Sequence, residues 1–254
     1  NWNTLRKSIN FSLIFIIVNL TFIFPQNSLD FDYFFKKYPK ENRQRFEKEI
    51  LKFEEIDKKT SYDDNSIMFI GSSSIRLWDK LEDVMEPLNI IKRGYGGAHY
   101  RDLIFFIDRI LNNHSLSMIV CFVANDIKGL EDIYNIGGER DGSIEEIINL
   151  YDFLVNQIRK KYPQIPIIQI EITPTSSRWK YWKKISDLNK SIKDYCNKNY
   201  NMHYIETKDL FLNKNGTPNN NLFRRDLLHL NDKGYNIWNK IVKEKLLSIK
   251  NWFY

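Results

Sequence analysis

The protein has 254 residues, which is enough for one sizeable domain with a full hydrophobic core. Apolar residues make up 43% of the chain and aromatic residues 15%, and this composition excludes an intrinsically disordered protein. The formal charge of +6 is modest and the lysines are scattered along the chain. We therefore expect a solvated basic surface and no nucleic-acid partner.

The N-terminal residues 1–26 have the pattern of a secretory signal. Arg6 and Lys7 precede the apolar stretch INFSLIFIIVNLTFIF, and a basic start before an apolar segment of this length is typical of export. The stretch is short for a membrane-spanning helix, which needs about 20 mostly apolar residues. No small-x-small cleavage site follows it, so an uncleaved membrane anchor is the alternative. We expect an exported protein, periplasmic or secreted, with its functional domain over residues 27–254.

Apolar runs and helical patterns alternate along the rest of the chain. Region 31–65 contains RFEKEILKFEEI, whose apolar spacing predicts an amphipathic helix. Strands are predicted at 66–71, 88–97, 116–126, 165–175 and 202–207. Further helices are predicted at 100–113, 143–162, 182–198 and 232–250. Ser143 and Glu146 form a capping-box pattern at the start of the second of these helices.

Strands that alternate with helices predict βαβ units and a parallel sheet. Their continuous apolar character indicates burial on both faces. The sequence thus predicts an α/β protein, a three-layer α/β/α sandwich with about five parallel strands. We find no internal repeat and no sign of a second domain.

Ligands of an open parallel sheet bind beyond the carboxyl ends of its strands. The loops at that edge are GSSS after the first predicted strand, RGYGGAH after the second and VAND after the third. We expect all three to meet at one edge. Segment 127–143, IKGLEDIYNIGGERDGS, is predicted to border the same region.

A serine hydroxyl becomes a nucleophile only when a base takes its proton, and that base is usually a histidine held by a carboxylate. The chain has four histidines. His99 follows the glycine loop, His203 begins a strand, and His114 lies beside asparagines at a helix end, where we expect it on the surface. His229 has Asp226 three residues before it, and in a turn these two side chains can face each other. By itself the D-x-x-H motif arises often by chance. The presence of the GSSS loop, and the position of D-x-x-H just before the last predicted helix, favour a catalytic pair.

Catalysis by serine also needs donors for a developing oxyanion. The GYGGA loop offers backbone N–H groups, although glycines there also suit a tight turn. Asn125 offers a side-chain amide, although Asn125 and Asp126 also suit a helix N-cap.

In this combination the chain resembles the SGNH hydrolases, also called GDSL-type esterases and lipases. It is most similar to the branch related to platelet-activating-factor acetylhydrolase. The resemblance runs from about residue 67 to about residue 245 and rests on four blocks in order. These are GSSSIRLW, KRGYGGAHYRDL, VAND and DLLHLNDKGY, and ITPTSSRW (172–179) also resembles this branch. The resemblance implies a flavodoxin-like fold and ester hydrolysis without a cofactor or metal.

The resemblance also implies the roles of individual residues. Ser73 is the expected nucleophile, His229 the base and then the acid, and Asp226 the group that orients the histidine. The N–H groups of Ser73 and Gly97 and the Nδ2 amide of Asn125 are the expected oxyanion donors. We therefore expect a serine esterase.

Two positions depart from the family pattern. Ser72 stands where the family often has aspartate, and Val123 replaces the usual glycine of the third block. The valine bears on the path of the local backbone more than on the oxyanion donor, because the side chain of Asn125 supplies the donating amide.

The substrate is less defined by the sequence. The resemblance implies ester hydrolysis, most often of short acyl groups, and does not identify the alcohol. We expect short-chain esters, above all acetyl esters, of a carbohydrate or a lipid, while thioesters and acylated amines stay open. The alternative is a catalytically inactive glycan-binding protein that uses RWKYWKK (178–184), where cations alternate with aromatic rings. The same segment also suits the start of an amphipathic helix with solvated lysines.

The two cysteines, Cys121 and Cys196, lie in a strand-like run and a helical pattern, and we expect buried thiols and no disulfide. No metal-ligand spacing and no phosphate-binding loop of the G-x-x-x-x-G-K type occurs in the sequence. The sequence does not indicate an oligomeric state.

Overall fold

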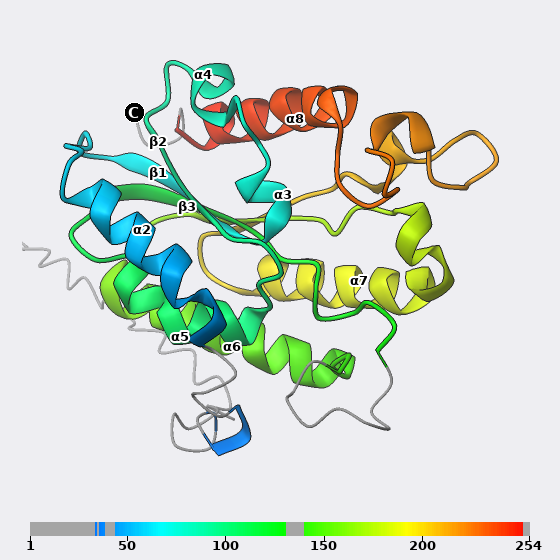
Figure 1. Ribbon diagram of the computed structural model, residues 1–254, viewed down its shortest axis with the longest axis horizontal. Coiled ribbons are helices and arrows are strands. Elements are labelled where there is room, and N and C mark those ends of the chain that lie inside the picture. The colour runs from blue at the N-terminus through cyan, green and yellow to red at the C-terminus, as the bar shows by residue number, and fades with distance from the viewer. Residues whose placement is uncertain (1–33, 35, 39–43, 131–139, 251–254) are drawn as a thin grey trace, which may run out of the picture.

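The computed structural model describes residues 34, 36–38, 44–130 and 140–250. Their strands form one parallel sheet with the order β2-β1-β3-β4-β5 (Figure 1). The strands are β1 (Ser66–Gly71), β2 (Ile90–Gly94), β3 (Leu116–Phe122), β4 (Ile167–Ile170) and β5 (Met202–Ile205). This is the flavodoxin-like order, and it confirms the predicted parallel sheet.

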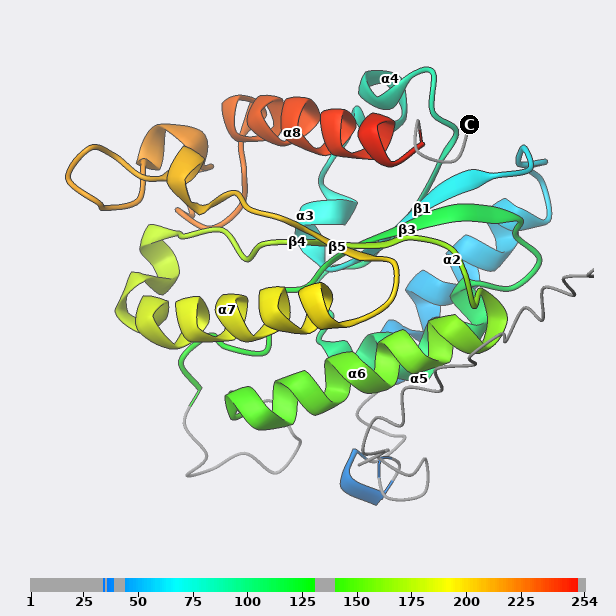
Figure 2. The ribbon, with the colours of Figure 1, turned by 180° about the vertical axis from the view of Figure 1, so that it is seen from behind.

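Helices cover both faces of the sheet, which confirms the three layers (Figures 1 and 2). One face carries α2 (Glu47–Asp57), α5 (Tyr100–Ile110), α6 (Ile144–Lys161) and α7 (Trp182–Lys198). The other face carries α3 (Ser73–Arg76), α4 (Leu81–Met85) and α8 (Asp232–Lys250). Short 3₁₀ turns complete the chain: η2 (Gln44–Phe46), η4 (Ser176–Tyr181), η5 (Lys208–Phe211) and η6 (Asn220–Leu222).

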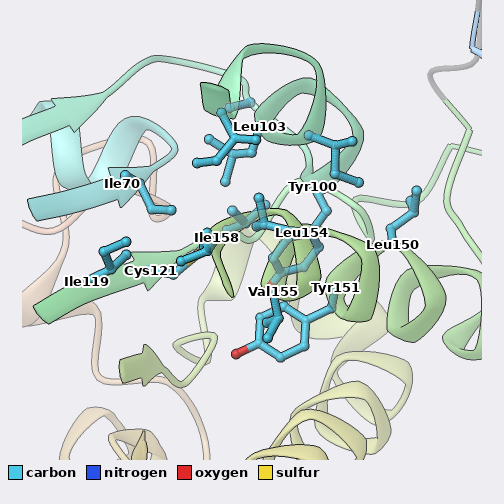
Figure 3. Packing of buried hydrophobic residues seen from close by; sticks show 14 of the residues in the cluster. Ile70, Tyr100, Leu103, Ile119, Cys121, Leu150, Tyr151, Leu154, Val155 and Ile158 are labelled. Atoms are coloured by element: carbon cyan, nitrogen blue, oxygen red, sulfur yellow. The ribbon is translucent and has the colours of Figure 1, made fainter. Parts of the chain in front are cut away.

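Two hydrophobic clusters flank the sheet because successive strand residues point to opposite faces. In β1, Met68 and Ile70 join the cluster under α2, α5, α6 and α7, whereas Ile67 and Phe69 join the cluster under α3, α4 and α8. Figure 3 shows Ile70 of β1 in the first cluster, among side chains of β3, α5 and α6. Burial on both faces explains why the strands read as unbroken apolar runs.

The helix boundaries follow the sequence patterns closely. The predicted helices 182–198 and 232–250 coincide with α7 and α8. At the start of α6 the Ser143 hydroxyl accepts a hydrogen bond from the Glu146 N–H at 3.0 Å, which is the serine half of the predicted capping box. The Glu146 carboxylate does not complete the box but accepts a hydrogen bond from Tyr38. The strands are shorter than predicted, because the last residues of 88–97, 116–126 and 165–175 form loops at the carboxyl edge.

The prediction that His114 lies on the surface is wrong. Only 2% of its side chain is exposed, and its Nε2 lies 3.3 Å from Asp57 Oδ2 at the end of α2. Its ring also packs edge-on against Tyr62 at 5.3 Å. The polar neighbours in sequence gave no sign that helix α2 would cover this turn.

Cys121 and Cys196 are buried and free, as expected. The predicted signal or anchor at residues 1–26 lies outside the described residues, as does part of segment 127–143. Among the described helices, none is long and apolar enough to cross a membrane.

Candidate active site

The three loops at the carboxyl edge of the sheet meet at a pocket of about 340 Å³. Ser73, Gly97, Asn125 and His229 all line it. The loops after β1, β2 and β3 therefore converge as expected, and the segment before α8 brings the histidine to them. His229 is the only histidine among the described lining residues.

Gly71 makes the sharp turn that places Ser73 in the pocket. Its φ of +136° is a conformation that side chains disfavour, and an added Cβ would lie 2.0 Å from the carbonyl oxygen of Phe122. The Ser72 N–H donates to that same oxygen at 2.9 Å, which ties the turn to the end of β3. Helix α3 then begins at Ser73, so the nucleophile candidate stands at the junction of strand and helix.

Ser73, His229 and Asp226 form a continuous hydrogen-bonded chain. His229 Nε2 lies 2.9 Å from Ser73 Oγ, and His229 Nδ1 lies 2.6 Å from Asp226 Oδ2. With Nδ1–H donating to the carboxylate, Nε2 is the acceptor that faces the serine hydroxyl. This is the relative geometry of a nucleophile, a base and an orienting acid.

The loop before α8 holds the Asp226 carboxylate in place. Asp226 Oδ1 accepts hydrogen bonds from the N–H groups of Leu228 and His229, both at 3.0 Å. Leu227, which follows Asp226 in the sequence, has a φ of +53°. Asp226 and His229 therefore face each other across a turn and not along a helix. Partial burial would raise the pKa of Asp226, but the hydrogen bonds from His229 and Leu228 lower it to about 2. The carboxylate is therefore charged at neutral pH.

The two other predicted donors flank Ser73. Gly97 has a φ of +82°, which turns the loop after β2 along the pocket. Asn125 Nδ2 donates to the Ala98 carbonyl at 2.9 Å. An amide nitrogen carries two hydrogens, so one remains for a ligand. Asn125 lies in the loop after β3, and its hydrogen bond to Ala98 connects this loop to the one after β2.

Sequence reasoning missed the role of Arg178. Its guanidinium donates to the Ala124 carbonyl and to Asn125 Oδ1, the latter at 2.9 Å. It therefore fixes which end of the Asn125 amide points to Ala98. Burial lowers the pKa of Arg178 from its ordinary value. The sequence offered only the alternation of cations and aromatic rings in RWKYWKK, which does not reveal that one cation turns inward.

The rest of RWKYWKK forms η4 and the first turn of α7. Trp179 and Trp182 stack on each other, with ring centroids 5.7 Å apart and planes at 16°. Both rings are half-buried, while Lys180 and Lys183 point to solvent. The segment thus matches the start of an amphipathic helix with solvated lysines.

The remaining site predictions concern residues behind the pocket. Val123 is fully buried in the hydrophobic core, so its side chain takes part in packing and not in the pocket. His99 is buried at the start of α5, where its Nδ1 lies 3.1 Å from Asp102 Oδ2. Within the described ranges, no three His, Cys, Asp or Glu side chains gather closely enough to hold a metal ion.

The chain matches the sequence model of a hydrolase family, and its fold is similar to that of solved hydrolases. The model of the GDSL-like lipase/acylhydrolase family matches residues 71–237, which include all four blocks. No curated protein matches the sequence.

Three solved structures illustrate the shared fold. A candidate platelet activating factor protein from Streptococcus pneumoniae is 21% identical with a TM-score of 0.67, over 79% of this chain and 92% of that one. A GDSL-like lipase from Bacteroides thetaiotaomicron is 16% identical with a TM-score of 0.61, over 82% and 98%. A carbohydrate esterase of family 3 from Talaromyces cellulolyticus is 16% identical with a TM-score of 0.55, over 73% and 97%. Since the family model covers most of the chain, including every loop that lines the pocket, the protein belongs to the GDSL-like lipase/acylhydrolase family.

Proposed function

We propose that the protein is a serine esterase that hydrolyses short-chain acyl esters, above all acetyl esters, of a carbohydrate or a lipid. The observation that carries the proposal is the hydrogen-bonded chain from Ser73 Oγ through His229 to Asp226, with contacts of 2.9 Å and 2.6 Å. Family membership supports a hydrolase acting on small ester substrates.

The reaction proceeds in two halves. Ser73 Oγ attacks the ester carbonyl carbon while its proton passes to His229 Nε2. The tetrahedral intermediate then collapses, the alcohol leaves with the proton from Nε2, and the acyl group stays on Ser73. A water molecule, deprotonated by the same nitrogen, attacks the acyl-enzyme and releases the acid and the free serine. Asp226 keeps Nδ1–H oriented and stabilises the imidazolium that forms in each half.

The oxyanion of each intermediate needs donors that are already in place. The N–H groups of Ser73 and Gly97 and the second Nδ2 hydrogen of Asn125 fill this role. Because Ala98 and Arg178 hold both ends of the Asn125 amide, this donor needs little reorganisation during the reaction. Loss of one such donor typically costs about 10²–10³-fold in kcat.

The pocket supports a short acyl group. Its volume of about 340 Å³ holds a short acyl group together with part of the alcohol. Its lining combines apolar side chains such as Phe122 and Ile172 with polar ones such as Thr173 and Thr175. A carbohydrate esterase among the structural neighbours supports a sugar ester as one candidate substrate.

The test is hydrolysis of p-nitrophenyl acetate, butyrate and octanoate by the full chain, beside Ser73→Ala and His229→Ala. We expect the highest kcat/KM with acetate, and a loss of at least about 10³-fold in both variants. Equal turnover by Ser73→Ala would refute the mechanism. A folded protein that hydrolyses none of the three esters would favour the alternative, an inactive glycan-binding protein that uses residues 178–184.

We also propose that residues 1–26 direct export or anchor the protein at a membrane, on the basis of the basic and apolar pattern given above. Fractionation of the producing cells tests this. The proposal requires the protein outside the cytosol, and deletion of residues 1–26 should retain it inside.

A further inference from the structure

The charges that line the active-site pocket are unbalanced. Its described lining residues include two arginines, Arg76 and Arg178, but no aspartate or glutamate. Asp226 lies behind His229 and does not line the pocket. A concave site lined by one sign of charge raises the local concentration of ligands of the opposite sign.

Arg178 is a largely buried cation without a carboxylate partner among the described residues. Among the described residues its hydrogen bonds go to two neutral acceptors, the Ala124 carbonyl and the Asn125 side chain. The charges of Asp141 and Asp126 act on the guanidinium, but neither forms an ion pair with it. Asp141 accepts hydrogen bonds from the backbone N–H groups of Lys128 and Gly129, and Asp126 accepts one from the N–H of Tyr100. A buried charge is costly unless it is paired. Three of the five N–H groups of the Arg178 guanidinium have no hydrogen-bond partner among the described residues.

Arg76 lies at the mouth of the same pocket, one helical turn after Ser73. Its Nε would be 3.2 Å from a Cβ added to Gly96, so the guanidinium rests on the glycine loop beside Gly97. Within the described ranges its side chain forms no hydrogen bond and no ion pair. Arg109 is the contrast, because its guanidinium is held by Glu47 and Glu54.

From these contacts we infer that the pocket selects esters that also carry an anionic group, a carboxylate or a phosphate, and that Arg76 binds this group. Arg178 adds a second positive charge deeper in the pocket. A guanidinium forms paired, charge-assisted hydrogen bonds with either anion. The inference rests on the proposed esterase function and narrows its substrate class to anionic esters.

The competing explanation is that the positive charge serves only the oxyanion of the reaction. That charge would accelerate neutral and anionic esters alike. A selectivity measurement therefore separates the two explanations, whereas an activity measurement alone does not.

The experiment compares matched pairs of acetyl esters with the full chain. The carboxylate pair is 4-acetoxybenzoate and its methyl ester, and the phosphate pair is 1-acetylglycerol 3-phosphate and 1-acetylglycerol. The readout is the ratio of kcat/KM for the anionic ester to that for its neutral partner. It is measured for the wild type, Arg76→Gln, Arg76→Lys and the control Lys80→Gln, which removes the same charge from an exposed position outside the pocket lining.

We expect the ratio to fall about tenfold in Arg76→Gln, to fall less in Arg76→Lys, and to stay at the wild-type value in Lys80→Gln. The wild-type ratio should also shrink in about 1 M salt, where the Debye length is about 3 Å. A fall in only one pair identifies the anion as carboxylate or as phosphate.

An unchanged ratio for both pairs in Arg76→Gln would overturn the inference, and so would an equal fall in Lys80→Gln. In both cases the esterase activity would stand. If no ester of either pair is hydrolysed in a Ser73-dependent way, the proposed function fails and this inference fails with it.

Discussion

The hydrogen bond from Arg178 to Asn125 predicts that the two residues act as one unit in catalysis. Arg178→Met removes the donor and its charge while it keeps an unbranched side chain of about the length of the arginine's aliphatic stem. The Asn125 amide would then keep its contact with Ala98 but lose the one that fixes Oδ1. We expect a lower kcat for neutral esters, because the oxyanion donor is less well ordered.

The size of the effect follows from the contacts. A hydrogen bond to a charged group contributes about 1.5–3 kcal/mol. We assign about half of that to the orientation of the amide, since Ala98 still holds Nδ2. Half is about 0.8–1.5 kcal/mol, and since about 1.4 kcal/mol corresponds to tenfold, we expect kcat of Arg178→Met to fall about 4- to 12-fold. Asn125→Ala alone should cost about 10²–10³-fold.

The assay is a double-mutant cycle on p-nitrophenyl acetate, with thermal unfolding of each variant to exclude loss of the fold. If Arg178 acts through Asn125, the double variant should be as slow as Asn125→Ala, within about twofold. Arg178→Lys serves as a control that keeps the charge without the planar fork. A further tenfold fall in the double variant would refute the reasoning, because it would mean that the arginine acts independently.

Other predictions concern the turns and the charge of the site. Gly71→Ala should lower the free energy of unfolding by about 3 kcal/mol or more, because its Cβ would overlap the Phe122 carbonyl; Gly97→Ala, with open space around it, should cost about 1 kcal/mol. Thermal unfolding that ranks them otherwise contradicts this account. The pKa of Asp226 is lowered, so its stabilising contribution is present above pH 4 and lost as pH falls toward 2. The melting-temperature difference between wild type and Asp226→Asn should therefore be present at pH 5 and shrink as the pH falls from 4 toward 2.

The fold was largely predictable because its strands are buried on both faces. Their apolar runs, separated by helical patterns, determine a parallel sheet, and the carboxyl-edge rule then indicates where ligands bind. Helices α7 and α8 could be bounded closely because their apolar spacing is regular. Strand ends could not, since apolar residues such as Val123 and Ile172 continue into the loops and still pack in the core or line the pocket.

Part of the candidate site was predictable for a different reason. Ser73, Gly97, Asn125 and His229 lie in short blocks whose order matches a family pattern, and the pocket brings these blocks together. Arg178 lies in no such block, and its inward turn depends on how η4 follows β4. His114 was misjudged for the same reason, since its burial depends on helix α2, which is distant in the sequence.

The most direct test of the central claim is to identify the serine that reacts. The full chain is treated with a fluorophosphonate, digested and analysed by mass spectrometry, beside His229→Ala. We predict a single adduct on Ser73, and strongly reduced labelling in the variant because the base at 2.9 Å is lost. An adduct on Ser72 or Ser74, or equal labelling without His229, would contradict it.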